Sequence, residues 1–481
     1  MKNSMFFGTL LAAVLLSLVT GPDLVARAQP DQAAASRAVN PATSPWFVSW
    51  VDRSTSSDVG AYPSVAYNPS DGLPYISYYD SVNGHLMLAS PAVPGGTGNC
   101  GTGLNWWCRV VDGNGANGSS LDNVGRYSSI DFWSGVDEGT PVWKLGIAYH
   151  DDTTNALKYA VWTQQNPSFG NWDFVTIAST ISPVQVIGLH TSLKYDSTGK
   201  PRIAYQNTFG STGSLEFAYW VGSGGNCGEG DHLNTWHCDS IQSGLLLGQD
   251  ISLAMDYNDF FSIAYHAHGS GELRYAYYHG PSGGTCGSGE YDCVVIDGSS
   301  AADVGQSAAL TGRRSAADPH RIAYYDRTNG KLKYAFQTGS NANCGEGKWF
   351  CGIVDSIGAN ISIVGLSMTL DKNGYPIIAY EDAMGQSSTL NIARPYFAVD
   401  LGWGNCGGTF PGYLFTYWQC DTIDNAAYGV GSVNVGQYTS VAVGPGGLGT
   451  IVYYEKDSFD SMNSLKVASQ RFQTFLPLTI K

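Results

Sequence analysis

The chain has 481 residues, of which 25 are basic and 40 acidic, and its formal net charge is −15. This balance, without any cluster of lysine and arginine, excludes nucleic acids and anionic membranes as partners, because both select clustered positive charge. A charged fraction of 14%, beside 60 glycines, 29 tyrosines and 13 tryptophans, is typical of a turn-rich all-β protein.

The N-terminal residues 1–28 have the pattern of a secretory signal peptide. A basic start precedes an apolar run over residues 5–19, and Ala26-Arg-Ala28 supplies the small residues of a cleavage site. Residues 29–45 are rich in alanine, serine, proline and glutamine, which is typical of a flexible leader. No later segment reaches the roughly 20 consecutive apolar residues of a membrane span. The sequence therefore predicts an exported protein, secreted or at the cell surface, with no transmembrane segment.

From residue 46 onward, one unit of short strands recurs seven times. Its clearest copy is residues 320–336, where two strands with alternating apolar residues flank an Asp/Asn-Gly turn. In each copy the second strand ends in a tyrosine and the third begins with Leu-x-x-Ala. The tyrosines are Tyr78, Tyr149, Tyr205, Tyr265, Tyr324, Tyr380 and Tyr453, and the leucines are Leu86, Leu157, Leu215, Leu273, Leu332, Leu390 and Leu465. Because the tyrosine never varies, we expect it to pack between neighbouring sheets. Such repetition predicts one array of small sheets rather than several domains.

A small residue near the start of each first strand marks the repeat. Its copies lie about 60 residues apart, which is room for four antiparallel strands and their loops. The markers are Ser64, Ser129, Ser192, Ser252, Ala309, Thr369 and Ser440. We therefore predict an all-β fold, a seven-bladed β-propeller of four-stranded antiparallel blades.

The ends of the repeat array predict how the ring closes. The segment Trp46-Phe-Val-Ser-Trp-Val51 precedes the first copy and matches Trp349-Phe-Cys351, in the fourth strand of the fifth copy. The seventh copy stops after its third strand, near Gln470. We expect residues 46–51 to complete the seventh blade, which would tie down both termini and leave no open edge. The propeller would then span residues 46–472, followed by a C-terminal tail at residues 473–481.

The ten cysteines form an independent pattern. In each pair the first cysteine lies in a glycine-rich loop and the second in the following outer strand. The pairs are Cys100 with Cys108, Cys227 with Cys238, Cys286 with Cys293, Cys344 with Cys351, and Cys406 with Cys420. An even number in an exported protein predicts five disulfides within single blades, at the end opposite the histidine-rich loops. A zinc site would need four converging ligands, whereas each pair belongs to a different blade.

The repeats also carry a resemblance to a known family. The segments Pro201-Arg-Ile-Ala-Tyr205 and Leu332-Lys-Tyr-Ala335 resemble the repeats of secreted bacterial β-propellers of the broad sialidase-like, BNR-type group. The resemblance implies a propeller but little about chemistry. The Ser-x-Asp-x-Gly-x-x-Trp turns of sialidases and a repeated arginine placement are absent from the sequence, so sialidase activity is not expected. Some seven-bladed polysaccharide lyases act with a His/Tyr pair, but no motif matches theirs.

The residues just after each recurring tyrosine vary, and this variation predicts the ligand site. In a propeller these positions surround one mouth of the central channel, and variable loops on a rigid scaffold carry function. Tyrosine rings there would stack on sugars, and the polar groups would bond their hydroxyls. The ligand-binding candidates on or near this rim are Tyr79, Asp80, Arg126, Asp151, His190, Gln206, His268, Tyr325, Asp326, Glu381 and Tyr454.

Catalysis is the second interpretation of the same rim. His150 and His266 are the candidate general bases, since an imidazole beside a carboxylate works near neutral pH, and Arg126 could neutralise an acidic sugar. No metal site is predicted, because His150, His266 and His268 lack a recognised ligand spacing. No cofactor is predicted either, although Asp151, Asp152 and Asp382 supply oxygen ligands that suit calcium, without an EF-hand signature.

These observations leave three functions. The first is a monomeric recognition propeller that binds a glycan or another extracellular ligand at the rim. The second is a polysaccharide lyase or glycoside hydrolase that uses a histidine base on blades two to four. The third is a scaffold for protein partners. A lectin-like propeller would repeat its site in several blades, whereas an enzyme would concentrate unique polar groups in one sector.

Overall fold

The computed structural model describes residues 45–53, 58–93, 96–137, 140–163, 171–359, 365–384, 387–396, 404–408, 417–425, 433–457 and 462–470. The chain divides into two units, Met1–Ala38 and Val39–Lys481, and all described residues belong to the second. The predicted signal peptide, the predicted leader up to residue 44 and the predicted tail lie outside the described residues.

Five sheets contain four antiparallel strands each, paired in chain order. The first sheet contains β2 (Val59–Tyr67), β3 (Pro74–Asp80), β4 (His85–Pro91) and β5 (Trp106–Asp112). The second contains β6 (Val124–Asp137), β7 (Thr140–Asp151), β8 (Ala156–Thr163) and β9 (Asp173–Ala178). The third contains β10 (Gln185–Tyr195), β11 (Pro201–Phe209), β12 (Thr212–Trp220) and β13 (Trp236–Leu245). The fourth contains β14 (Leu247–Met255), β15 (Phe261–Ala267), β16 (Glu272–Tyr278) and β17 (Tyr291–Gly298). The fifth contains β18 (Val304–Thr311), β19 (Arg321–Asp326), β20 (Lys331–Gln337) and β21 (Trp349–Ser356). Short 3-10 helices span Thr102–Leu104, Gly230–His232 and Gly345–Gly347.

The remaining strands form one sheet of eight. One half contains β22 (Leu366–Leu370), β23 (Pro376–Met384), β24 (Ser387–Tyr396) and β25 (Tyr417–Asn425), and the other contains β26 (Val433–Val443), β27 (Gly449–Asp457), β28 (Ser464–Gln470) and β1 (Trp46–Arg53). The halves are joined through the parallel pair Ser388 and Asn434. Strand β1 pairs antiparallel with β28, from Trp46 opposite Gln470 to Arg53 opposite Ser464. The predicted all-β fold of four-stranded antiparallel sheets is therefore confirmed.

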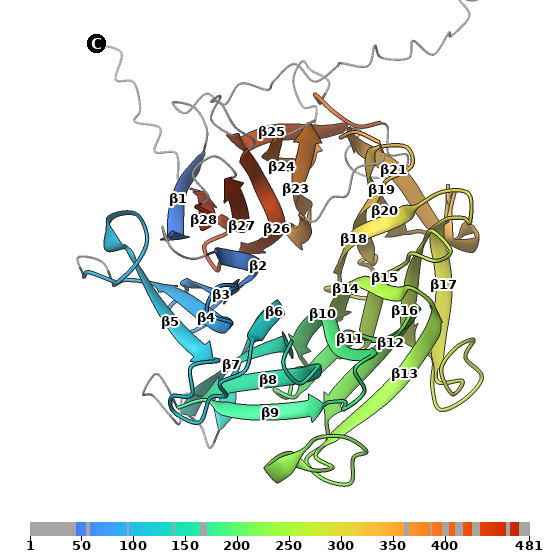
Figure 1. Cartoon of the computed structure of the whole chain (residues 1–481). Helices are drawn as coiled ribbons and strands as arrows, with labels where there is room; N and C mark the ends of the chain where they lie inside the picture. The colour runs from blue at the N-terminus through green and yellow to red at the C-terminus, as the bar shows by residue number, and fades with distance from the viewer. Residues whose placement is uncertain are drawn as a thin grey trace, which may run out of the picture. The chain divides into compact units, whose positions relative to one another are not determined.

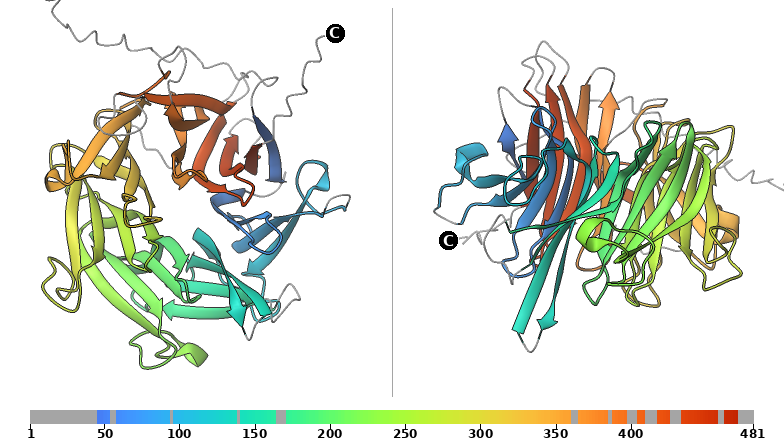
Figure 2. Two further views of the ribbon diagram at one scale, coloured as in Figure 1. Left: turned by 180° about the vertical axis from the view of Figure 1, so that it is seen from behind. Right: turned by 60° about the horizontal axis from the view of Figure 1, so that its bottom comes forward.

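Within this unit the first strands of the sheets face a common centre, as Figures 1 and 2 show for β2, β6, β10, β14 and β18. Each first strand contacts the first strand of the next sheet, and β26 contacts β2. Serine hydroxyls link these strands: Ser252 Oγ accepts from the backbone N–H of Leu310 at 2.9 Å, and Ser64 Oγ from Ile130 at 3.2 Å. In the sixth copy Ser367, not the marker Thr369, takes this role by accepting from the N–H of Val441. The predicted register was wrong there by two residues, since the small residue must face its neighbour.

The recurring tyrosines hold neighbouring sheets together. Tyr149 is fully buried, and its hydroxyl donates to Asp112 Oδ2 on the fourth strand of the preceding sheet at 2.7 Å. Lys158 Nζ donates to the same oxygen. Burial alone would raise the pKa of the Asp112 carboxyl, but the Lys158 ammonium outweighs it and the pKa lies below its usual range. The same tyrosine-to-carboxylate bond recurs at Tyr78 with Asp52, Tyr324 with Asp297, Tyr380 with Asp355 and Tyr453 with Asp424. This confirms the packing role expected of the invariant tyrosine.

A glycine in each of six first strands allows the sheets to approach closely. Gly125 has φ +114°, and a Cβ atom added there would lie 2.8 Å from Cα of Leu86, the recurring leucine of the preceding sheet. No side chain fits in that space, and the left-handed φ also favours glycine. The other glycines that meet a recurring leucine are Gly60 with Leu465, Gly188 with Leu157, Gly248 with Leu215, Gly305 with Leu273 and Gly436 with Leu390. The recurring leucine is therefore a contact between sheets.

The five predicted disulfides are all formed within single repeats, with Cα–Cα distances of 5.8–6.0 Å. Each joins a loop cysteine to the outer strand that follows it, as predicted. The bonds are Cys100 to Cys108, Cys227 to Cys238, Cys286 to Cys293, Cys344 to Cys351, and Cys406 to Cys420. Each loop joins a third strand to a fourth, so it lies at the end of the sheet opposite the second-to-third loop.

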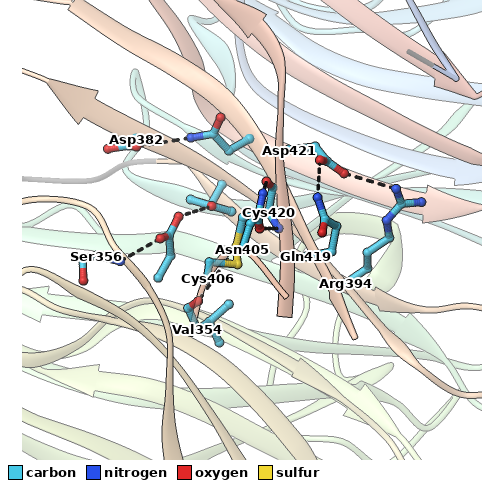
Figure 3. Close-up of a disulfide and its surroundings, with 12 residues drawn as sticks. Val354, Ser356, Asp382, Arg394, Asn405, Cys406, Gln419, Cys420 and Asp421 are labelled. Carbon is cyan, nitrogen blue, oxygen red and sulfur yellow. Dashed lines mark hydrogen bonds and ion pairs between the residues drawn. A yellow bond between two sulfur atoms is a disulfide. The ribbon is translucent and has the colours of Figure 1, made fainter. Parts of the chain in front are cut away.

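Hydrogen bonds hold each disulfide loop against its own outer strand. Figure 3 shows Asn405 in this role, since its side chain accepts from the Cys420 N–H and donates to the Cys420 carbonyl, both at 2.7 Å. Asn226 accepts in the same way from the N–H of Cys238 at 2.6 Å. At Cys293 the acceptor is instead the hydroxyl of Thr285, at 3.0 Å. The residue before the loop cysteine therefore fixes the loop, whether it is asparagine or threonine.

Among the described residues, no helix is long and apolar enough to cross a membrane.

We expect Gly125→Ala to destabilise the protein by about 3 kcal/mol or more, because the new Cβ would collide with Leu86 and the backbone would be strained. Urea denaturation gives the free energy of unfolding. Gly118→Ala is the matched control, because Gly118 also has a positive φ (+85°) but nothing lies within 4 Å of the added Cβ. It should cost about 1–2 kcal/mol. Equal losses in both variants would show that the contact with Leu86 does not matter.

Candidate functional site

The residues that directly follow the recurring tyrosines are buried, contrary to the prediction of exposed stacking faces. Tyr79, Tyr325 and Tyr454 are at most 6% exposed. The Tyr79 hydroxyl donates to Asn123 Oδ1 at 2.7 Å, and the Tyr325 hydroxyl donates to the Gly358 carbonyl at 2.6 Å. Asn123 lies just before the first strand of the next sheet, and so does Asp58, which the Tyr454 hydroxyl reaches in the same way, whereas Gly358 follows β21 of the same sheet. These rings are covered by the segment that they bind, so they present no face to a ligand.

The other rim candidates serve the same packing or close their own turns. Gln206 is buried, and its Nε2 donates to the Leu247 carbonyl of the next sheet at 2.7 Å. Asp80, Asp151 and Asp326 accept hydrogen bonds from N–H groups two to three residues further on, for example from Thr153 and Thr154 to Asp151. Aspartate at the start of a tight turn commonly caps it in this way. Glu381 is also buried. The printed contacts of Gln206 and of the three aspartates thus lie within the protein itself.

His150 is placed between sheets rather than at an exposed site. Its side chain is 1% exposed, and Nδ1 donates to the Ile187 carbonyl at 2.8 Å. Nε2 lies 3.1 Å from Asp152 Oδ1, and Asp152 also pairs with Arg126 at 3.0 Å. Burial raises the pKa of the Asp152 carboxyl, but His150 and Arg126 outweigh it and the pKa is lowered. With both ring nitrogens engaged, His150 does not have the geometry of a general base.

The first strands carry a different set of side chains, which the sequence analysis did not single out as a group. Each of six strands has two breaks in its register: the contact glycine lies in the first, and a residue two positions later, with φ of +49° to +54°, lies in the second. The residues are Tyr438, Tyr62, Tyr127, His190, Asp250 and Ser307. We call this set the central arc. A positive φ is uncommon outside glycine, so its recurrence at one position marks a built feature.

The members of the central arc contact one another in order. The ring centroids of Tyr438 and Tyr62 are 4.4 Å apart, those of Tyr62 and Tyr127 are 4.6 Å apart, and those of Tyr127 and His190 are 4.8 Å apart. The next member of the arc is Asp250, and its Oδ2 accepts from the N–H of Ser307, the last member, at 2.9 Å. Aromatic rings therefore occupy one side of the arc, and a small residue ends it.

Arg126 adds a positive charge to the aromatic side of the arc. Its guanidinium lies 5.7 Å from the ring centroid of Tyr62 and 5.5 Å from that of Tyr127, and it donates to the Tyr62 hydroxyl at 3.3 Å. The Arg126 side chain is 35% exposed. Nη1 of Arg126 donates to both carboxylate oxygens of Asp152, at 3.0 and 3.1 Å, so Asp152 holds the guanidinium beside the two rings. Arg126 is therefore a predicted residue that the structure does place beside other candidates.

His190 is the second predicted residue in this group. The backbone N–H of Asp250 donates to His190 Nδ1 at 3.2 Å, so in the neutral ring the proton sits on Nε2. Burial lowers the pKa of His190, and the Asp250 carboxylate only partly opposes this. The Nε2–H of this neutral ring takes no part in the contact with Asp250. His190 therefore offers a hydrogen-bond donor rather than a base.

His266 and His268 lie further along the same rim. His266 is buried, and its Nε2 is 2.9 Å from Asp303 Oδ1 in the segment that precedes β18. His268 Nδ1 is 3.9 Å from Asp303 Oδ2, and the His268 side chain is 37% exposed. Asp250 lies 4.0 Å from His266 Nδ1 and 3.7 Å from His190 Nδ1, so it stands between the arc and this histidine pair. The predicted base His266 thus faces carboxylates rather than open solvent.

Comparison with known proteins adds little to this picture. No family model matches the chain, and no curated protein matches it. Among solved structures, the polysaccharide lyase Uly1 is 11% identical, with 86% of this chain and 90% of that chain covered and a TM-score of 0.43. An α-L-arabinofuranosidase from Lactobacillus brevis is also 11% identical, with 76% and 91% covered and a TM-score of 0.26. At these scores the similarities carry no argument, and no family model supports the resemblance to BNR-type repeats.

The lowered pKa of His190 predicts a pH dependence of stability. In the unfolded chain an imidazole titrates near 6.5, so as the pH falls the unfolded state binds the proton first. The contribution of His190 is therefore present above about pH 6.5 and lost below it. We expect His190→Gln to reduce the fall in unfolding free energy between about pH 7.5 and about pH 5.5, measured by urea denaturation.

A His190→Gln protein with the wild-type slope would show that His190 is not held neutral in the folded state.

Proposed function

We propose that the chain is an exported recognition protein that binds a glycan at the central arc of a seven-bladed β-propeller. The observation that carries the proposal is the joining of tyrosine rings in contact, the partly exposed Arg126 guanidinium and the Nε2–H donor of His190 on one side of the centre. Aromatic rings offer apolar faces to the C–H surfaces of sugars, and the positive charge of a partly exposed guanidinium attracts carboxylate or sulfate groups. An acidic glycan is thus the ligand that this set of groups fits best.

The side chains of the central arc are bulky on one side and small on the other, and this asymmetry suits a ligand. The same position is Ser307 in the fifth sheet, and the matching residue in the sixth is Gly365, two before the linking Ser367. The bulky side chains therefore stand opposite small ones, beside the polar residues Asp303 and His268. One sector with unique groups does not fit a lectin that repeats its site in every blade, and we infer a single binding site per chain.

Binding is favoured over catalysis by the state of the possible bases. His150 has both ring nitrogens engaged, His190 presents a donor, and Asp152 is paired with Arg126. None of these groups is an accessible base next to a donor, which a lyase or hydrolase needs. The enzyme and the protein scaffold remain the alternatives, and each gives a distinct outcome in the binding experiment below.

The architecture in this proposal is a closed ring over residues 46–472, exported as a monomer. Four contacts support the role of β1 as the fourth strand of a seventh blade. It pairs with β28, Asp52 accepts from the Tyr78 hydroxyl at 2.7 Å, the Cys108 Sγ lies 3.6 Å from the Val51 carbonyl, and Trp50 N–H donates to Thr102. In the same way, Tyr149 of the second sheet and Tyr380 of β23 each donate a hydroxyl hydrogen bond to a carboxylate on the fourth strand of the preceding sheet.

The function is tested on an array of uronic-acid, sulfated and neutral glycans. We expect the wild type to bind acidic glycans and Arg126→Gln to bind them about tenfold more weakly or worse, a loss of about 1.4 kcal/mol or more. Arg202→Gln is the matched control, because Arg202 also pairs with an aspartate (2.7 Å to Asp196) and stacks over a tyrosine (5.2 Å from the Tyr219 centroid), at the other end of its sheet.

Each other outcome has a defined meaning. Release of unsaturated or reducing sugars by the wild type would favour the enzyme. Binding that is equal in both arginine variants would place the site elsewhere, and the absence of glycan binding would leave the scaffold as the surviving function.

Ring closure is tested by truncation. Deleting residues 29–53 should lower the melting temperature sharply or prevent soluble expression, because it exposes the edge of β28 and leaves Tyr78 without its carboxylate. Deleting residues 29–44 alone is the control and should change little. Equal melting temperatures for the two truncations would contradict closure by β1.

A further inference from the structure

A compact group of metal-ligating side chains lies outside the central arc. His266 is in β15 and His268 lies in the turn that follows, and the centroids of their rings are 5.5 Å apart. Asp303 comes from the segment before β18, in the next sheet. One ligand atom from each of these residues lies within 4.8 Å of the others. Two imidazoles and a carboxylate from neighbouring sheets thus converge on one point.

The buried atoms of this group are not satisfied by hydrogen bonds. His266 Nδ1, His266 Nε2 and Asp303 Oδ1 are buried without a hydrogen-bond partner among the described residues, although Nε2 and Oδ1 are only 2.9 Å apart. The two atoms are close but are not aligned as donor and acceptor. Unsatisfied polar atoms are rare in protein interiors and call for a cause such as a bound ion.

The spacing matches that of two ligands on one cation. Ligands bound at about 2.1 Å with angles between those of an octahedron and a tetrahedron lie about 3.0–3.4 Å apart. His266 Nε2 and Asp303 Oδ1 are already near this spacing. His268 is further away, but its side chain is 37% exposed and is free to turn toward the other two.

We propose that His266, His268 and Asp303 bind a divalent transition-metal ion of the zinc type. Two nitrogens and one oxygen suit Zn²⁺ and its neighbours, whereas Ca²⁺ and Mg²⁺ prefer oxygen ligands alone. Three protein ligands leave a further coordination position for water or a ligand. This site is distinct from the acidic loops considered for calcium.

Neighbouring groups leave one oxygen of Asp303 for the ion. Asp303 Oδ2 accepts from Gln306 Nε2 and from Arg327, both at 3.2 Å, which leaves Oδ1 for the ion. Asp250 Oδ2 lies 4.0 Å from His266 Nδ1, which is too far for a hydrogen bond, so Asp250 adds negative charge beside the ligand.

The alternative to a metal ion at this site is a proton on His266. A protonated His266 beside Asp303 would form an ion pair in the same positions without any metal. Arg327 contacts Asp303 through Oδ2 and would do so with either occupant. Direct measurement of metal binding separates the two occupants.

The experiment uses the full exported chain without a histidine tag, treated with a chelator and then titrated with Zn²⁺ by calorimetry and with Co²⁺ by visible absorption. We expect one ion per chain and a Co²⁺ spectrum typical of nitrogen and oxygen ligands. His268→Ala should weaken binding by more than about tenfold, as losses around metal sites commonly do. Because His268 is partly exposed, this change should leave the melting temperature of the metal-free protein unaltered.

His279→Ala is the matched control, since His279 also lies beside a carboxylate, 2.7 Å from Asp292, but belongs to no such group of ligands among the described residues. It should bind as the wild type does. If His268→Ala fails to fold, His268→Gln replaces it. Absence of binding in the wild type, or equal binding in wild type and the His268 variant, overturns the site. Glycan binding and its loss in Arg126→Gln are measured on the chelator-treated protein, so failure of the metal site and failure of the glycan site are distinguishable.

Discussion

The fold depends on a buried hydrogen bond that recurs between neighbouring sheets. A tyrosine hydroxyl from the second strand of one sheet donates to a carboxylate on the fourth strand of the sheet before it, as Tyr324 does to Asp297. A lysine of the third strand, such as Lys333, neutralises that carboxylate. A buried carboxylate left unpaired would be costly, so a sheet that carries one needs its neighbour to be in place. The recurring glycine of a first strand then lets this strand approach the recurring leucine of the preceding sheet closely enough for these groups to meet.

That close approach also determines where functional side chains can stand. The contact glycine lies in the first of two breaks in the strand register, and a residue in the second break takes a left-handed conformation that turns it away from the normal alternation of the strand. Tyr127 and His190 reach their places in this way. Because the backbone here is the same in six first strands, a change of residue at this one position changes the chemistry of the centre without disturbing the packing. Evolution of specificity in such a scaffold needs few substitutions.

Sequence patterns were enough to predict features with a period or a partner along the chain. The invariant Tyr324 was recognised as packing, and the pairing of Cys344 with Cys351 followed from loop and strand positions. The rim was misjudged because residues such as Tyr79 look exposed until the next sheet is seen to cover them. The arc was missed as a group because a left-handed residue inside a strand has no sequence signature of its own. The sequence signal that marks each arc residue is the glycine two positions earlier, as in Gly125 and Gly188. This glycine was not among the recurring residues used to define the repeat.

Asp250 connects the two proposed sites through one carboxylate. Its Oδ1 lies 3.7 Å from the His190 ring of the arc, while its Oδ2 lies 4.0 Å from His266 and also accepts from Ser307. A metal ion on His266 would draw the remaining proton of that ring toward Asp250 and reduce the negative charge that His190 experiences. His190 would then be a better donor to an acidic ligand on Arg126. The arrangement therefore predicts that metal and acidic glycan bind with positive coupling, and linkage requires the effect to be equal in both directions.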